Sequence, residues 1–410
     1  REGNTMSTNI EETKKENPLG TEPVGKLLRK FAVPSIISML VMSLYNIVDQ
    51  IFIGQTVGTL GNAATNVAFP LTTLCIATAL AFGIGGASGF NLNLGAGNKD
   101  KAPYFIGNAL SMMAIIGIVL AVIASIAMKP LLLFFGSTDK VLPYAMEYTR
   151  FIALGFPFAI ISAGGSHLVR ADGSPNFSMA CNLVGAVTNV VLDYVFVIVL
   201  KLGVEGAAIA TVISQYLSGI GISLYSLIKN IQVRAIMKLQ YFHLKRVHKV
   251  ISFSVLTCIQ QSVMNLGILM VQGLVNSFGT VVMAAFAAAV KIDAFAYMPV
   301  QDFGNAFSTF IAQNYGAKEK MRIQSGLKSA VCLSMGFCMI ISTIVCIFAK
   351  DLMTIFIDAK ETEIIMEGVK YLKIEGAFYC GIGCLFLLYG LYRALGKPGM
   401  SVVLTIFSLG

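Results

Sequence analysis

The stretch 181-CNLVGAVTNVVLDYVFVI-198 decides the class of fold. It is apolar over a length that crosses a bilayer, yet it contains Asn189 and Asp193, four residues apart. Residues at this spacing lie on one face of a helix, one turn from each other. An ionised carboxylate inside hydrocarbon costs roughly 2.5–3.5 kcal/mol on insertion scales. Asp193 therefore needs a proton, a bound cation or a water-filled cavity, unless it forms a packing hydrogen bond between helices.

The composition of the whole chain is that of a membrane protein. Of its 410 residues, 56% are hydrophobic and only 12% are charged, whereas soluble domains have about 25% charged residues. The net charge of +9 would suit a nucleic-acid binder, but the basic residues fall in short loops between apolar runs. That distribution is the positive-inside pattern. We expect an all-α polytopic membrane protein that contacts a lipid bilayer and no nucleic acid.

The reactive side chains give no support for an enzyme. The chain has three histidines, and most of its eight cysteines lie inside apolar runs without a pairing pattern, as small packing residues do. A His–carboxylate pair, or a Gly-flanked serine beside a base, is not visible. We therefore expect no catalytic residue and no cofactor apart from a coupling ion.

Apolar runs predict ten membrane-spanning helices and the start of an eleventh. Residues 1–25 are predicted as a disordered tail, and 230–249 as a basic linker. Of the 30 Lys and Arg residues, 21 lie on the side of the N-terminus and 6 on the other, so the N-terminus is expected in the cytoplasm. The predicted spans are 31–55, 66–91, 102–128, 141–170, 176–200, 205–229, 250–276, 280–314, 326–349 and 363–393, with the eleventh beginning near Gly399.

The chain contains a parallel internal repeat with a shift of about 222 residues. FAVPSII at Phe31 faces FSVLTCI at Phe253, and RADGSP at Arg170 faces RALGKP at Arg393. Chance similarity between apolar helices does not explain loop motifs shared in the same order. An even number of spans separates the copies, so both halves have the same topology.

The repeat predicts two six-helix bundles, residues 26–229 and 250–410. Twelve helices are expected and about 10.5 are present, because Gly410 faces Val187 inside the fifth span. We therefore expect the C-terminal bundle to be truncated within its fifth helix.

Polar side chains of the first half are predicted to meet at one level of the membrane. With a rise of 1.5 Å per residue, Asp49 and Asp193 both lie about 27 Å along outward-running helices. Tyr148 and Thr211 reach a similar level from the outer side, and Asn189 lies one turn deeper. Carboxylate, amide and hydroxyl oxygens suit Na⁺. Two nearby carboxylates also disfavour double ionisation, so the pair could hold a proton instead.

The second half carries different polar groups. Asp49 faces Val271 in the repeat, while Asp293 and Asp302 lie in the eighth predicted span with Lys291. Pairing with other helices and a role toward substrate both remain open for these acids. The candidate residues of a substrate cleft are Gln50, Gln272, Asp293 and Asp302.

Motifs along the chain resemble bacterial members of the multidrug and toxic compound extrusion (MATE) family. They are FAVPSIISMLVMSLYNIVDQIFIGQ at Phe31, NLGAGNKDK at Asn93, VRADGSPNFSM at Val169, NVVLDYVFV at Asn189, KIDAFAYMPVQ at Lys291 and IAQNYGAKEK at Ile311. The resemblance implies two six-helix bundles around a central cleft, in a plasma (inner) membrane of bacterial type.

The resemblance also assigns residues. It implies a cation site in the first bundle at Asp49, Asn189, Asp193 and Thr211, with Tyr148 nearby, and a helix kink at Pro34. One branch of the family has a glutamate in the seventh helix and an aspartate in the tenth. Here the seventh has Gln260 and Gln261, and the tenth has Glu375 and no aspartate, so coupling is expected in the first bundle.

We therefore expect a monomeric antiporter, driven by H⁺ or Na⁺, that exports small organic and often cationic molecules. The alternative is a lipid-linked oligosaccharide flippase of related architecture. A flippase would need a cleft rich in cationic residues for pyrophosphate, and the intramembrane Lys and Arg residues here are few.

Overall fold

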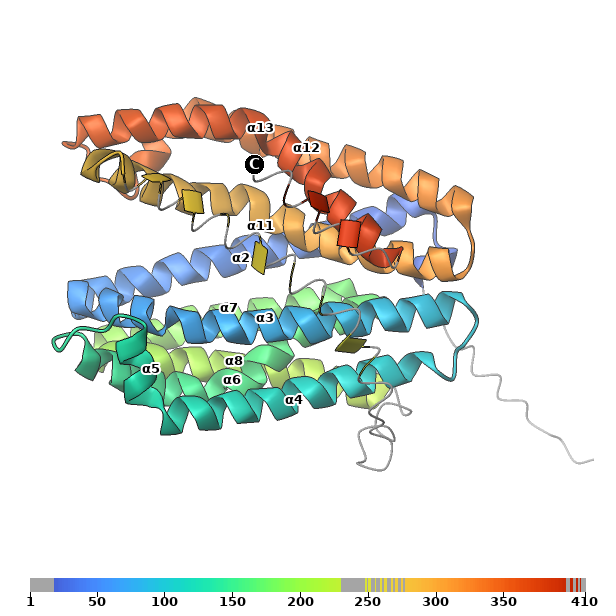
Figure 1. The fold of residues 1–410 in the computed structure, drawn as a ribbon, viewed down its shortest axis with the longest axis horizontal. Helices are drawn as coiled ribbons and strands as arrows, with labels where there is room; N and C mark the ends of the chain where they lie inside the picture. The colour runs from blue at the N-terminus through green and yellow to red at the C-terminus, as the bar shows by residue number, and fades with distance from the viewer. Residues whose placement is uncertain are drawn as a thin grey trace, which may run out of the picture.

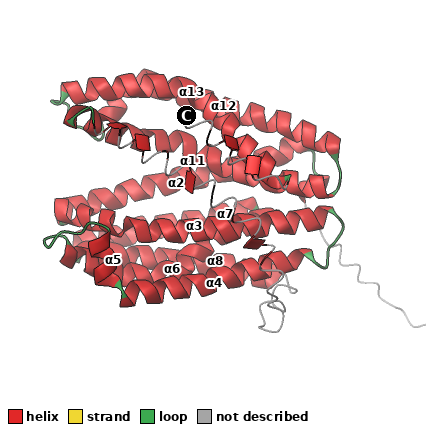
Figure 2. Ribbon diagram, viewed as in Figure 1, coloured by secondary structure: helices red, strands yellow, loops and turns green. Residues whose placement is uncertain are grey.

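The computed structural model describes residues 18–229 and 277–395, together with scattered positions between 248 and 275 and between 399 and 406. In this part the chain is helical and contains no strand (Figure 2). Nine of the described spans are long and apolar enough to cross a membrane, which confirms the predicted fold class. The elements are α1 (Pro18–Thr21), α2 (Val24–Thr56), α3 (Thr59–Gly95), α4 (Ala102–Ile126), α5 (Met128–Phe134), α6 (Leu142–Ala171), α7 (Pro175–Asp193), η1 (Tyr194–Val199), α8 (Gly203–Lys229), α11 (Thr280–Gly316), α12 (Lys320–Thr354) and α13 (Thr362–Ala394).

Several helices are longer than the predicted spans. The helix α3 begins at Thr59 instead of residue 66, and α12 covers 320–354 instead of 326–349. Hydropathy detects where a helix enters hydrocarbon, whereas backbone hydrogen bonding continues beyond that level until a turn ends the helix. The linker 230–249 and the predicted spans 250–276 and from Gly399 onward lie largely outside the described residues.

The predicted disordered tail is wrong for residues 18–25. This segment forms α1 and the start of α2, and Leu19 is completely buried. Arg322 of α12 donates hydrogen bonds to the carbonyl oxygens of Leu19 (3.3 Å) and Glu22 (2.9 Å). The helical structure of this segment therefore depends on a contact with a residue 300 positions away. The periodicity of the local sequence cannot indicate such a contact.

The internal repeat is visible in the lengths of α3 and α11. Both have 37 residues, and they begin at repeat-equivalent threonines, Thr59 and Thr280. The residue before each is a glycine with positive φ, 74° at Gly58 and 98° at Gly279, a conformation that a Cβ atom disfavours. The same turn therefore starts the same long helix in each half.

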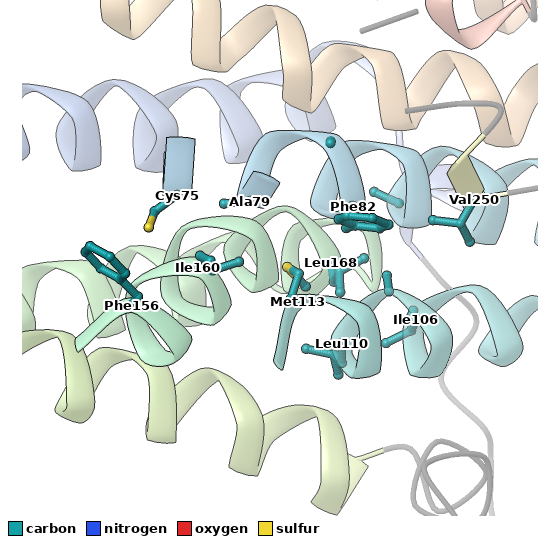
Figure 3. Close-up of a cluster of buried hydrophobic side chains, with 14 of the residues drawn as sticks. Cys75, Ala79, Phe82, Ile106, Leu110, Met113, Phe156, Ile160, Leu168 and Val250 are labelled. Atoms are coloured by element: carbon teal, nitrogen blue, oxygen red, sulfur yellow. The ribbon is translucent and has the colours of Figure 1, made fainter. Parts of the chain in front are cut away.

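The helices α3, α4 and α6 share a core (Figure 3). Phe82 and Cys75 of α3 and Phe156 and Leu168 of α6 are buried there, and Met113 of α4 is fully buried among them. Because lipid provides little hydrophobic drive between helices, such cores depend on close packing. From here on we treat α2, the first helix of the predicted bundle 26–229, separately. We call α3 to α8 the first bundle, and α11 to α13, which pack on one another, the second bundle.

Helix α2 lies between the two bundles (Figure 1) and packs against α7 on one side and α11 on the other. Leu27 and Phe31, near its start, are buried in the second bundle's core with Phe307 of α11. Ile53, near its end, is buried against Val197 and other residues of the first bundle. A single helix therefore packs into hydrophobic clusters of both bundles, one at each of its ends.

The two ends of the molecule differ in charge. We call the end at which α3, α6 and α11 finish the basic end, because Lys99, Lys101, Lys318 and Lys320 lie in its loops or next to them. It is the right-hand end in Figure 1. The positive-inside pattern predicts that the basic end is cytoplasmic.

Candidate functional site

The structure brings Asp49 and Asp193 together. Asp49 lies on α2 and Asp193 is the last residue of α7, and these two helices pack along each other. The two carboxyl groups are neighbours. Asp49 is 9% exposed and Asp193 is 0% exposed. Residues 144 positions apart in the sequence therefore form one buried acid pair.

Most oxygens of the acid pair accept no hydrogen bond from the residues that the structure describes. These atoms are Oδ1 of Asp49 and both Oδ1 and Oδ2 of Asp193. A buried charge without a partner costs far more than a paired one. Two ionised carboxylates at this position would therefore be costly unless a proton, a cation or water lies beside them.

Neutral oxygen groups line the same place. Asn189, one turn before Asp193 on α7, donates a hydrogen bond from its amide nitrogen to Oγ1 of Thr211 on α8, at 3.3 Å. The amide oxygen of Asn189 is buried and has no donor among the described residues. It adds a fourth unpartnered oxygen to the three of the acid pair.

Two tyrosines flank the acid pair. Tyr148 of α6, which the sequence analysis placed at this level, and Tyr45 of α2 both lie within electrostatic range of Asp49 and Asp193. Tyr45 was not among the predicted site residues. The available signal was its spacing, since Tyr45 precedes Asp49 by one helical turn and so shares its face.

The chain changes its helical form directly after Asp193. Residues 194–199 form the π-helix η1, with Val197 fully buried on the inner side. Short π-helical segments inside α-helices are rare and are found often at functional sites. This feature has no signal in residue type or hydropathy, so the sequence analysis could not have found it.

The structure places the candidate residues of the substrate cleft at separate positions. Gln50 is exposed and donates to Oγ1 of Thr65 at 3.3 Å, while Gln272 lies outside the described residues. Asp293 accepts a hydrogen bond from the hydroxyl of Tyr379 on α13. Asp302 accepts from the guanidinium of Arg170. Both acids are thus buried. Both oxygens of Asp302 and Oδ1 of Asp293 have a partner, whereas Oδ2 of Asp293 has none among the described residues. The proposed contact of these acids with substrate stays a prediction.

Pro34 lies inside α2, which continues as a helix on both sides of it. Proline has no backbone N–H and its ring crowds the preceding turn, so α2 lacks one intrahelical hydrogen bond at this position. Ser35, the next residue, is 1% exposed and accepts a hydrogen bond from Arg170. The predicted kink at Pro34 stays a prediction.

Comparison with known proteins identifies the family. The sequence profile described as MatE matches residues 34–195 and 254–410. An FAD transporter of Shewanella oneidensis is 25% identical over 410 residues, covering 97% of this chain and 88% of that protein. The multidrug export protein MepA of Staphylococcus haemolyticus is 21% identical, covering 93% and 84%.

Solved structures share the fold. A structure described as the outward-facing conformation of a multidrug resistance MATE family transporter of the MOP superfamily matches with a TM-score of 0.88 at 22% identity. The match covers 96% of this chain and 87% of that one. Since the MatE profile matches most of both halves, the chain belongs to the MATE family of membrane transporters.

Proposed function

We propose that this protein is a cation-coupled antiporter that exports amphipathic organic molecules by alternating access. The observation that carries the proposal is the buried acid pair, whose unpartnered oxygens require a positive charge. Asp49, Asp193, Asn189 and Thr211 would hold Na⁺, with Tyr148 and Tyr45 beside them. Alternatively, the two carboxyl groups would share a proton.

The position of the acid pair suits coupling. A ligand shifts a conformational equilibrium only by its difference in affinity for the two states. Asp49 lies on α2, whose first turns are buried in the core of the second bundle, while Asp193 lies on α7 of the first. A cation bound between them would favour the arrangement of α2 in which both carboxyl groups face it.

The driving force is adequate for export. One elementary charge that moves down a potential of 100 mV releases about 2.3 kcal/mol. At about 1.4 kcal/mol per tenfold concentration ratio, this supports roughly a fifty-fold gradient of substrate per ion. One cation per cycle would therefore sustain useful efflux.

The test is efflux of a cationic aromatic dye from proteoliposomes under separate Na⁺ and pH gradients. We expect Asp49→Asn and Asp193→Asn each to abolish gradient-driven efflux, because the pair can no longer hold the coupling ion. Asp172→Asn is the matched control, since Asp172 lies in a loop at the basic end and pairs with Lys229. Full coupled efflux by both pair variants would contradict the proposal.

The substrate class is tested in the same vesicles with FAD. This second probe is justified by the relative named as an FAD transporter. Export of the dye but not of FAD supports a drug exporter for amphipathic cations. Export of FAD alone would replace that substrate class with an anionic dinucleotide and leave the coupling site unaffected.

A further inference from the structure

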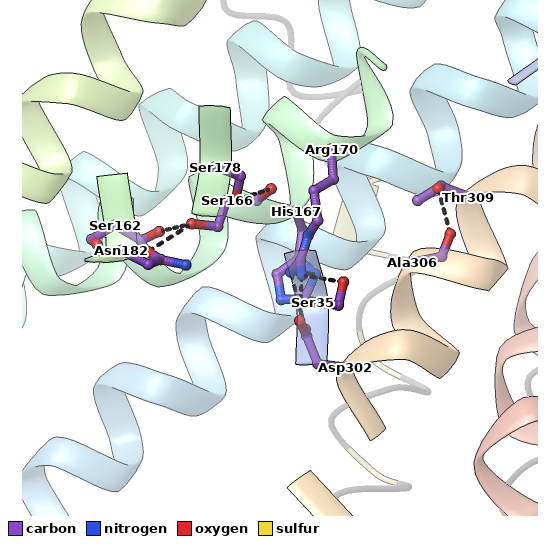
Figure 4. A network of polar contacts seen from close by, with 10 residues as sticks. All are labelled: Ser35, Ser162, Ser166, His167, Arg170, Ser178, Asn182, Asp302, Ala306 and Thr309. Carbon is purple, nitrogen blue, oxygen red and sulfur yellow. Dashed lines mark hydrogen bonds and ion pairs between the residues drawn. The ribbon is translucent and has the colours of Figure 1, made fainter. Parts of the chain in front are cut away.

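A buried ion pair joins the two bundles near the basic end (Figure 4). The guanidinium of Arg170, on α6, donates from Nη1 to Oδ2 of Asp302, on α11, and from Nη2 to Oδ1 at 3.0 Å. Both carboxylate oxygens are therefore bound in the fork geometry that fixes position as well as charge.

Further contacts hold Arg170 in place. Its Nη1 also donates to Oγ of Ser35 on α2, at 3.2 Å. Its Nη2 lies 3.0 Å from Nδ1 of His167. Because a guanidinium has only donors, this His167 nitrogen acts as the acceptor. The first bundle, α2 and the second bundle thus meet at one guanidinium.

This ion pair differs from the other ion pairs of the described residues. Arg170 and Asp302 are 5% and 3% exposed, whereas the remaining pairs have side chains exposed by 14–63%. Lys229–Asp172 lies within the first bundle and Lys370–Glu367 within one helix. Among described residues, only Arg170–Asp302 therefore joins the bundles through opposite charges.

The backbones of the two bundles also approach closely at the basic end. A Cβ atom on Gly95 of α3 would lie 1.9 Å from the carbonyl oxygen of Gln313 on α11. A Cβ atom on Gly316 would lie 2.3 Å from the carbonyl oxygen of Leu92. Small residues allow such contact between membrane helices. The two bundles are thus in direct contact at this end, which is closed, and the ion pair is buried between them.

We propose that Arg170 and Asp302 are positioning residues of the transport cycle that hold the basic end closed and separate when it opens. In the closed state each charge is buried against a fixed partner, while in the open state water replaces that partner. Loss of either charge then favours the open state, since the remaining charge is stable only when hydrated. This inference rests on the alternating access of the proposed function.

Hydrogen–deuterium exchange in lipid nanodiscs tests the proposal without ion gradient or drug. The segments to compare are both ends of the same helices, 85–95 and 305–316 at the basic end and 59–70 and 280–291 at the other end. We expect Asp302→Asn and Arg170→Gln to raise exchange at the basic end on the order of tenfold, because a minor open state becomes populated. Exchange at the opposite end should fall, since the two ends open alternately.

The controls distinguish an ion pair that holds the basic end closed from a contact that only stabilises the fold. Asp302→Glu keeps the charge and should stay close to the unmodified protein, and Asp172→Asn, which breaks the ion pair within the first bundle, should change neither end. Unchanged exchange in both charge-loss variants, or a rise at both ends together, would overturn the proposal. If those variants do not fold, Arg170→Lys is measured instead, because it keeps the charge but cannot bind both carboxylate oxygens. Its exchange must then rise at the basic end and fall at the opposite end, by less than in the charge-loss variants.

This experiment is independent of the coupling site. If Asp49→Asn and Asp193→Asn retained coupled efflux, the assignment of the cation site would fail while the exchange result could still stand. Conversely, unchanged exchange in the Arg170 and Asp302 variants would exclude the proposed role of the ion pair and leave the dye-efflux test unaffected.

Discussion

The acid pair Asp49–Asp193 and the ion pair Arg170–Asp302 are both buried, yet their carboxylates have opposite surroundings. Asp302 is held by a guanidinium that contacts both of its oxygens. Both oxygens of Asp193 lack a donor among the described residues, and its close neighbour is a second acid. The neighbouring group, rather than burial, therefore distinguishes the two sites. Asp302, bound by an arginine, joins helices, whereas Asp193 lies beside another acid, where we propose that a cation or a proton binds.

The two sites should differ most in how far the free energy of unfolding falls when one member of the pair is replaced. Arg170→Gln leaves the charge of Asp302 buried without compensation, so the free energy of unfolding should fall by about 3–5 kcal/mol. Thermal unfolding in detergent can be followed with a thiol-reactive dye as an increase above the signal of the exposed Cys332, because Cys75 and Cys338 are buried in the folded chain. A loss below about 1 kcal/mol would show that Asp302 is hydrated or neutral in the folded protein.

Asp293 provides an intermediate case, since its partner is a neutral hydroxyl. Tyr379→Phe removes the O–H that donates to Asp293 and leaves a nearly isosteric ring. A buried acceptor that loses its donor costs about 1–3 kcal/mol. The same dye assay measures it, and Tyr297→Phe on α11 is the matched aromatic control. Equal stability of Tyr379→Phe and the unmodified protein would mean that this hydrogen bond contributes nothing.

Replacement of one acid of the pair Asp49–Asp193 should not lower the free energy of unfolding. Asp193→Asn removes one of two neighbouring acids and supplies an amide N–H that can donate to Asp49. The free energy of unfolding is therefore expected to stay equal or rise, by up to about 1 kcal/mol. A clear fall would mean that Asp193 has a structural partner, and the contrast with Arg170–Asp302 would disappear.

Much of the fold was predictable because the signals are local. Apolar runs located the described membrane helices, although the predicted start at residue 66 missed the first turns of α3, which begins at Thr59. Leu19 and Arg322 show where prediction failed. Their contact joins the start of the chain to α12, and no periodicity in a polar segment indicates such a partner.

The candidate site was predictable for a related reason. An acid in an apolar run is conspicuous, and the rise per residue of a helix is enough to compare the depths of Asp49 and Asp193. The role of Arg170 was not visible, since an arginine at the end of a span usually faces water or lipid headgroups. Only the packing of α6 against α11 brings it to Asp302. The π-helix after Asp193 also depends on packing and not on residue type.

Infrared difference spectroscopy on the purified protein tests the central claim most directly. A protonated carboxyl group has a C=O band that an ionised carboxylate lacks, so addition of Na⁺ or a rise in pH should remove such a band from the acid pair. We predict that Asp49→Asn and Asp193→Asn lose this response and that Asp302→Asn keeps it. A spectrum without any such band, or a response that persists in both pair variants, would contradict the binding of a proton or a cation by the acid pair.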